Sequence, residues 1–183
     1  DTNVVDCMIR LLPSKVNGYK INLEASTNST GLIGISPTVS YYNRNIFKGG
    51  EWLSLSVMGN FQFSVRDATR ATEFGASAGL SFPTFVLLPD RMFKNIVPRT
   101  DLELTYNFQR RPEYTRNMLG ANFGWNWNSQ SNKYYFKVVP LQINIVNLPV
   151  YSGSFMESLT NPFVREAYKN HFEVGLGFDV QYS

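Results

Sequence analysis

Residues 34–63 read GISPTVSYYNRNIFKGGEWLSLSVMGNFQF and predict a long β-hairpin. Apolar and small polar residues alternate over residues 35–42 and again over 53–63, which is the period of a β-strand. Between the two runs, residues 43–51 contain the pair Gly49-Gly50, and glycine reaches the positive φ angles that a tight reversal needs. The stretch is therefore interpreted as strand, turn, strand.

The same alternation continues along most of the chain. Beyond the hairpin it predicts strands over residues 19–26, 74–82, 101–109, 119–128, 135–145 and 171–182. The strand over 135–145 is expected to bulge at Pro140, which has no N–H for the ladder. A short helix is predicted over residues 162–169, because Asn161 can cap it and proline fits its first position. The result is about eight strands of roughly ten residues, the length at which a tilted strand crosses a bilayer.

Composition narrows the class of protein. Charged residues make up 17% of the 183 residues and aromatic residues 15%, whereas soluble domains contain about 25% charged residues. The net charge of +3 comes from scattered side chains, which argues against a nucleic-acid partner. The single cysteine, Cys7, excludes an internal disulfide framework and is expected to be a buried thiol in a strand. No run of residues reaches the apolar length of a membrane helix.

The two faces of the predicted strands differ sharply in polarity. One face carries Leu, Ile, Val, Phe, Tyr and Trp, and the other carries Ser, Asn, Gly, Gln, Thr, Asp and Glu. Aromatic residues gather near the strand ends, as in an interfacial girdle: Tyr41, Phe61, Phe82, Phe108, Trp125, Trp127, Tyr135, Phe172 and Tyr182. In lipid every backbone polar group needs a partner within the protein, which a closed sheet supplies. We therefore expect an all-β, antiparallel transmembrane β-barrel; the alternative is a soluble sandwich with one wet face.

Several motifs resemble one family. The turn Asn45-Ile46-Phe47-Lys48-Gly49-Gly50-Glu51 is similar to the Asn-Leu-Phe-Gly-x-Gly-Glu turn between the second and third barrel strands of the BamA and TamA assembly factors, the bacterial surface antigen family. Lys48 replaces the first glycine of that motif. Pro-Arg-Thr at 98–100, Gln-Arg-Arg at 109–111 and Gly-Trp-Asn-Trp at 124–127 resemble successive features of the same family. Asn-Pro-Phe at 161–163 is similar to the lipoprotein-type TamA relatives.

The resemblance implies a half of a larger barrel. Residues 1–17, with a strand over 4–12, would end a preceding periplasmic domain and linker, and residues 18–183 would be the N-terminal half of a sixteen-stranded outer-membrane barrel. Family members insert or export client proteins through a lateral seam at the first barrel strand in Gram-negative bacteria. The implied partners are outer-membrane lipids, client barrel or exported proteins, and periplasmic or inner-membrane assembly proteins, with no cofactor. A passive pore or small structural barrel remains the alternative.

The seam edge can be named residue by residue. An edge strand with unpaired N–H and C=O groups templates another strand. In the predicted first strand the edge residues are Tyr19, Lys20, Ile21, Asn22, Leu23, Glu24, Ala25 and Ser26. The alternative is that this strand is sealed to its neighbour, as in a porin. Pro37 removes an N–H donor from the second strand; we expect it to mark a bulge, and the alternative is that it weakens one of the ladders of that strand.

The connections between the strands divide into two groups. If the chain enters from the periplasm, residues 43–50, 84–99 and 129–133 are predicted to be periplasmic, and residues 28–31, 65–72, 110–114 and 148–170 to face outwards. The long segment 84–99 breaks the short-turn rule, and we expect it to contact a partner.

The sequence gives less support to a catalytic function. Asp101 and Glu103 share a face about 7 Å apart, but polar lumen residues are commoner than catalytic pairs. His171 has no second ligand or nucleophile at catalytic spacing and is expected at the rim. We predict a protein that is not an enzyme.

Overall fold

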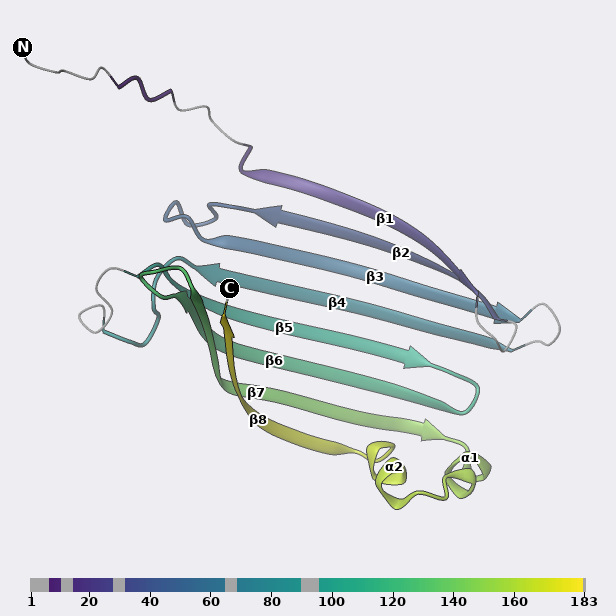
Figure 1. Ribbon diagram of the computed structural model, residues 1–183. Coiled ribbons are helices and arrows are strands. Elements are labelled where there is room, and N and C mark those ends of the chain that lie inside the picture. Colours follow the sequence, from purple (N-terminus) through teal and green to yellow (C-terminus); the bar gives the residue numbers. More distant parts are fainter. Residues whose placement is uncertain (1–6, 11–14, 28–31, 65–68, 90–95, 183) are drawn as a thin grey trace, which may run out of the picture.

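The chain forms a single sheet of eight antiparallel strands in sequence order. The computed structural model describes residues 7–10, 15–27, 32–64, 69–89 and 96–182. The strands are β1 (Asn17–Thr27), β2 (Leu32–Asn43), β3 (Trp52–Ser64), β4 (Arg70–Phe82), β5 (Pro98–Arg110), β6 (Tyr114–Asn128), β7 (Tyr134–Tyr151) and β8 (His171–Tyr182). Each pairs with its neighbours in sequence, and within the described residues β1 and β8 are the outermost strands of an open, curved sheet (Figure 1). The prediction of an all-β fold with eight antiparallel strands is confirmed.

The register aligns residues of like polarity across all eight strands. One cross-strand row consists of Ile21, Val39, Val57, Ala76, Tyr106, Leu119, Ile145 and Phe172. The adjacent row, on the opposite face, consists of Lys20, Ser40, Ser56, Ser77, Thr105, Gly120, Asn144 and Glu173. We call these two sides the apolar face and the polar face. Because side chains alternate along a strand, most apolar residues of each strand lie on the same side.

The apolar face is the exposed one. Leu55 is 40% exposed and Leu176 83% exposed, so these side chains do not converge on a dry interior. The buried hydrophobic residues of the described chain are few, namely Phe85, Tyr114 and Leu148, and Thr100, Gln109 and Asn126 are buried although polar. A soluble sandwich buries its apolar face between two sheets, which this sheet does not do.

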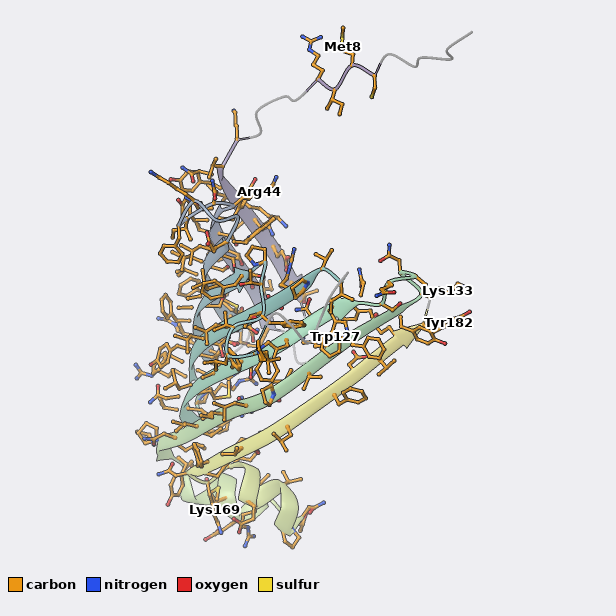
Figure 2. The ribbon with its side chains drawn as sticks, turned by 90° about the vertical axis from the view of Figure 1, so that its left-hand side faces the viewer. Met8, Arg44, Trp127, Lys133, Lys169 and Tyr182 are labelled. Carbon is orange, nitrogen blue, oxygen red and sulfur yellow. The ribbon has the colours of Figure 1, made fainter. Side chains whose placement is uncertain are left out.

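The connections lie at two opposite ends of the sheet. Arg44, in the turn between β2 and β3, marks one end, and Lys169, beside the helices, marks the other (Figure 2). We call them the turn end and the helix end. The short connections at 111–113 and 129–133 agree with the predicted turns, whereas the predicted turn at 28–31 lies outside the described residues.

Two short helices precede β8. Helix α1 (Gly153–Ser158) was not expected, and α2 (Pro162–Ala167) begins at the predicted proline but ends two residues before the predicted end. Within the described part of the chain, no helix has the length and apolar character to cross a membrane.

Prolines disturb the sheet in two different ways. Strand β7 has an extra residue near Pro140 relative to both neighbours, as predicted, and a second irregularity near Pro149 relative to β6. The predicted bulge at Pro37 is wrong. The pairs Ile35↔Phe61 and Thr38↔Met58 keep one register, so Pro37 interrupts the β2–β3 ladder without inserting a residue.

The chain before β1 does not form the expected strand where it is described. Cys7–Arg10 is not paired with a strand and leads away from the sheet, as the position of Met8 shows (Figure 2). Cys7 is exposed, which corrects the expectation of a buried thiol. A strand forms only where a partner takes up its N–H and C=O groups, and no such partner lies beside these residues in the described chain.

Candidate functional site

The predicted seam residues form the first edge of the sheet. Tyr19, Lys20, Ile21, Asn22, Leu23, Glu24, Ala25 and Ser26 all lie in β1, and every one of them pairs with β2. Within the described residues, no strand lies on the other side of β1. In an antiparallel ladder, alternate residues direct their N–H and C=O groups away from the partner. The outer side of β1 therefore presents a backbone template.

The apolar side chains of this edge are highly exposed. Tyr19 and Ile21 are each 76% exposed and Leu23 is 73% exposed. Lys20, Asn22 and Glu24 occupy the polar face. A strand that paired with this edge would therefore match it best if it also alternated between apolar and polar residues, as strands of the same sheet do.

The beginning of β1 is held firmly to β2. The Asn43 side-chain amide donates to Asn17 Oδ1 over 2.7 Å, the Arg44 N–H donates to the Val16 carbonyl, and the Tyr19 and Tyr41 rings lie 5.1 Å apart. These contacts lie at the turn end of the strand. The ladder continues past Pro37 through Leu23↔Pro37, because the interruption there affects the ladder with β3.

Two stacked rings and a guanidinium group lie at the same corner of the sheet, where β1 begins at the turn end. Tyr42 and Trp52 have ring centroids 5.9 Å apart, and the Arg44 guanidinium lies 4.9 Å from the Trp52 centroid. Tyr42 lies across Gly18, where an added Cβ would be 2.1 Å from Tyr42 Cζ. Sequence reasoning missed this cluster, because only the β1–β2 register brings Gly18 and Tyr42 together.

The family-like turn is fixed by its own polar side chains. The Glu51 carboxylate accepts from the Gly49 N–H at 3.0 Å and the Phe47 N–H at 3.3 Å, while Asn45 Oδ1 accepts from the Gly50 N–H at 2.9 Å. Hydrogen bonds from its own amide and from those of Gly49 and Phe47 lower the pKa of Glu51. Asn and Glu at these positions are therefore required by the turn itself, and Ile46 N–H donates to the Glu51 carbonyl.

Two residues of this turn have positive φ angles. Lys48 has φ of 68° and Gly50 has φ of 87°. Lys48 stands where the family motif has glycine, and it adopts the left-handed conformation that glycine favours. The chain therefore still reverses direction at this turn, with backbone strain at Lys48.

The described part of the long segment 84–99 packs on the sheet. The Thr100 hydroxyl donates to the Thr84 carbonyl at 2.7 Å and accepts from the Val86 N–H at 2.9 Å, and the Trp125 indole N–H donates to the Val86 carbonyl. Phe85 meets Trp127 edge to face, with centroids 5.8 Å apart. Sequence reasoning placed this segment at the turn end but missed its docking on the apolar face of β5 and β6.

The polar face is crossed by carboxylate–amide pairs. The side-chain amide of Asn107 donates to Glu73, that of Asn122 to Glu103, and that of Asn126 to Asp101. Asp101 and Glu103 therefore each face an asparagine from β6. In the described residues, no group of three or more His, Cys, Asp and Glu side chains is arranged to hold a metal ion.

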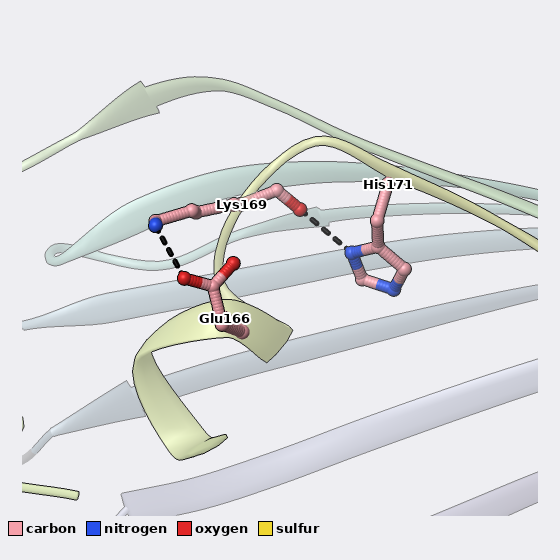
Figure 3. A network of polar contacts seen from close by, with 3 residues as sticks. All are labelled: Glu166, Lys169 and His171. Carbon is pink, nitrogen blue, oxygen red and sulfur yellow. Dashed lines mark hydrogen bonds and ion pairs between the residues drawn. The ribbon is translucent and has the colours of Figure 1, made fainter. Parts of the chain in front are cut away.

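His171 lies at the helix end, at the first residue of β8. Its Nδ1 donates to the Lys169 carbonyl at 2.7 Å, and Lys169 itself pairs with Glu166 of α2 (Figure 3). Nε2 lies 3.5 Å from Glu173. These contacts anchor the junction between α2 and β8 at the rim, as expected.

No protein-family model, curated protein or solved structure matches the chain. The family resemblance therefore stays a prediction, and we infer the function from the sheet, its faces and its edges.

Proposed function

We propose that this chain is part of an outer-membrane protein assembly or translocation factor, in which the β1 edge pairs with strands of client proteins. The sheet supports this with an apolar face that is exposed along all eight strands. Hydrocarbon is the solvent that such a face requires. In this proposal the sheet is one half of a transmembrane barrel, and its polar face lines the lumen.

The single observation that carries the proposal is the edge formed by β1. It combines an open backbone ladder, three apolar side chains more than two-thirds exposed, and charged residues on the opposite face. Edge strands in proteins that avoid pairing are usually covered, short or bulged. Strand β1 has 11 residues and keeps continuous register with β2.

A photo-crosslinking experiment tests this proposal. A photoreactive phenylalanine analogue replaces Ile21 in β1 or Val57 in β3, in the full protein in its own cells. Both positions belong to the same apolar cross-strand row, but β3 is paired on both sides. We expect client proteins to cross-link at Ile21 at least tenfold more than at Val57. Equal client yields at the two positions would contradict capture at the β1 edge.

The polar face favours a second candidate, a passive pore. A lumen lined by Glu73, Asp101 and Glu103 with their asparagine partners would hold water. This candidate predicts stable ion conductance in planar bilayers and no client cross-linking at Ile21.

A further inference from the structure

An open cleft lies at the helix end of the sheet, away from the β1 edge. It has a volume of about 1020 Å³ and is lined by the ends of β4 to β7, including Arg70, Phe108, Arg110, Arg111, Glu113 and Tyr151. Strand order places these residues together, since β4 begins, β5 ends, β6 begins and β7 ends at this rim. The cleft therefore collects side chains from the ends of four strands and from the connections next to them.

The charge of this cleft is strongly positive. Three arginines line it against one carboxylate, that of Glu113. Arg70, Arg110 and Arg111 are exposed, and within the described residues none of their guanidinium groups has an ion-pair partner. Arg116 differs, because its guanidinium donates to Gln109 and lies over the Tyr114 ring. The three lining arginines are thus available to an anion.

The position of two of these arginines relative to the apolar face is informative. Arg70 lies opposite Phe63, and Arg110 lies opposite Thr72, one step beyond the pair Phe74↔Phe108. Arg70 and Arg110 thus belong to the apolar face, at the point where its aromatic rows end. Val150, which lies opposite Thr115 and is 61% exposed, continues the apolar face on β7.

The geometry points to a binding site for the phosphate of an anionic lipid headgroup. The guanidinium groups would hold the phosphate oxygens through paired hydrogen bonds, and the acyl chains would lie along Phe63, Phe74 and Phe108. Arginine at the boundary between an apolar surface and water attracts anionic lipid. This inference rests on the membrane location in the proposed function, but not on client capture.

Lipid binding to the full chain in neutral detergent tests the site. The probes are dioctanoyl phosphatidic acid, the matched dioctanoyl glycerol and inorganic phosphate, and complexes are counted by native mass spectrometry. We expect phosphatidic acid to bind at least tenfold more tightly than either other probe. Inorganic phosphate binding as tightly as phosphatidic acid would overturn the lipid assignment.

Paired variants locate the binding. Arg110→Gln with Arg111→Gln should weaken phosphatidic acid binding at least tenfold, whereas Arg99→Gln with Lys133→Gln, which removes the same charge at the turn end, should leave it within about twofold. Arg110→Lys with Arg111→Lys keeps the charge and should give an intermediate loss, and thermal unfolding followed by circular dichroism checks the fold of each variant. Equal losses of lipid affinity in the two pairs of Gln variants would overturn the site.

The lipid site and the assembly function can fail separately. If lipid still binds at the cleft but Ile21 captures no client, only the assembly function fails.

Discussion

The two outermost strands of the sheet, β1 and β8, present different edges. Strand β1 pairs with β2 in one unbroken register, whereas the β7–β8 ladder shifts between Val139 and Gln142. The polar side of β1 carries Lys20, Asn22 and Glu24, and that of β8 carries Glu173 and Asp179 as well as Gly175 and Gly177. The apolar side of β8 is as exposed as that of β1, with Leu176 at 83%.

This difference indicates two kinds of edge. Charged side chains stand beside both edges, so the difference lies in the ladders: the bulge in β7 bends the β7–β8 pair, whereas β1 follows β2 without a bulge. We therefore infer that β1 is the edge better suited to pair with an incoming strand.

Proline substitutions at successive edge positions should have the largest effect. Of Ile21 and Asn22, one directs its N–H at β2 and the other directs it outwards. Proline at the outward position should reduce client insertion at least tenfold with the fold intact, because it removes an edge donor. Proline at the other position should destabilise the sheet itself. Client insertion in cells and circular dichroism of the purified variants make the measurement, and full insertion by both variants would contradict the account.

A methyl group at Gly18 should loosen β1, and one at Gly175 should not affect β8. The added Cβ at Gly18 would displace Tyr42 from its stack with Trp52 and Arg44, while at Gly175 it would meet Gln142 at ordinary distances of 3.7 Å and more. We expect Gly18→Ala to lower the free energy of unfolding by about 1–2 kcal/mol, and Gly175→Ala to change it by less than about 0.5 kcal/mol. Denaturant titration in detergent measures both; equal effects would show that the corner does not hold β1.

Glycine at position 48 should stabilise the turn beside β1. Lys48 has φ of 68°, so Lys48→Gly relieves a strained conformation and should raise the free energy of unfolding by about 0.5–1 kcal/mol. Because Arg44 N–H bonds to the Val16 carbonyl, hydrogen exchange should slow at the start of β1 and stay unchanged in β8. Lys133→Gly is the matched control, since Lys133 is not one of the described non-glycine residues that have a positive φ angle. If Lys133→Gly raised the free energy of unfolding by the same amount, relief of strain at position 48 would not explain the effect of Lys48→Gly.

Acid should weaken the same turn through Glu51. Its pKa is lowered in the folded protein by hydrogen bonds from backbone amides, its own first. The carboxylate therefore adds stability above its ordinary pKa, and this contribution is lost as the pH falls through the ordinary value towards the lowered one. Thermal unfolding at pH 7 and pH 3 should show a smaller acid loss for Glu51→Gln than for the unchanged chain. An identical pH dependence in the two proteins would mean that Glu51 does not hold the turn.

The strands could be predicted because their two faces differ at nearly every position. Alternation located β1 to β5 and β8 to within a few residues. It missed the first part of β6 and the last part of β7, where Asn117, Met118 and Asn147 break the pattern and pairing alone imposes the strand.

Contacts between distant segments could not be predicted in the same way. Thr100 was predicted only as the last residue before a strand, yet it lies within β5 and is fully buried beneath the 84–86 backbone. The arginines of the rim cleft come from separate strand ends, and only the register places them together. The turn motif was visible as a motif, but its function in fixing the loop backbone needed the positions of Asn45 and Glu51.

Lipid contact at neighbouring positions of β3 shows which face of the sheet meets hydrocarbon. With Cys7→Ser, a fluorescent label is attached to a cysteine in place of Leu55 or Ser56, which lie on opposite faces of the sheet. In bilayers containing brominated lipid, the account predicts strong quenching at position 55 and little at position 56. Weak quenching at both positions, or stronger quenching at 56, would show that the apolar face does not meet hydrocarbon.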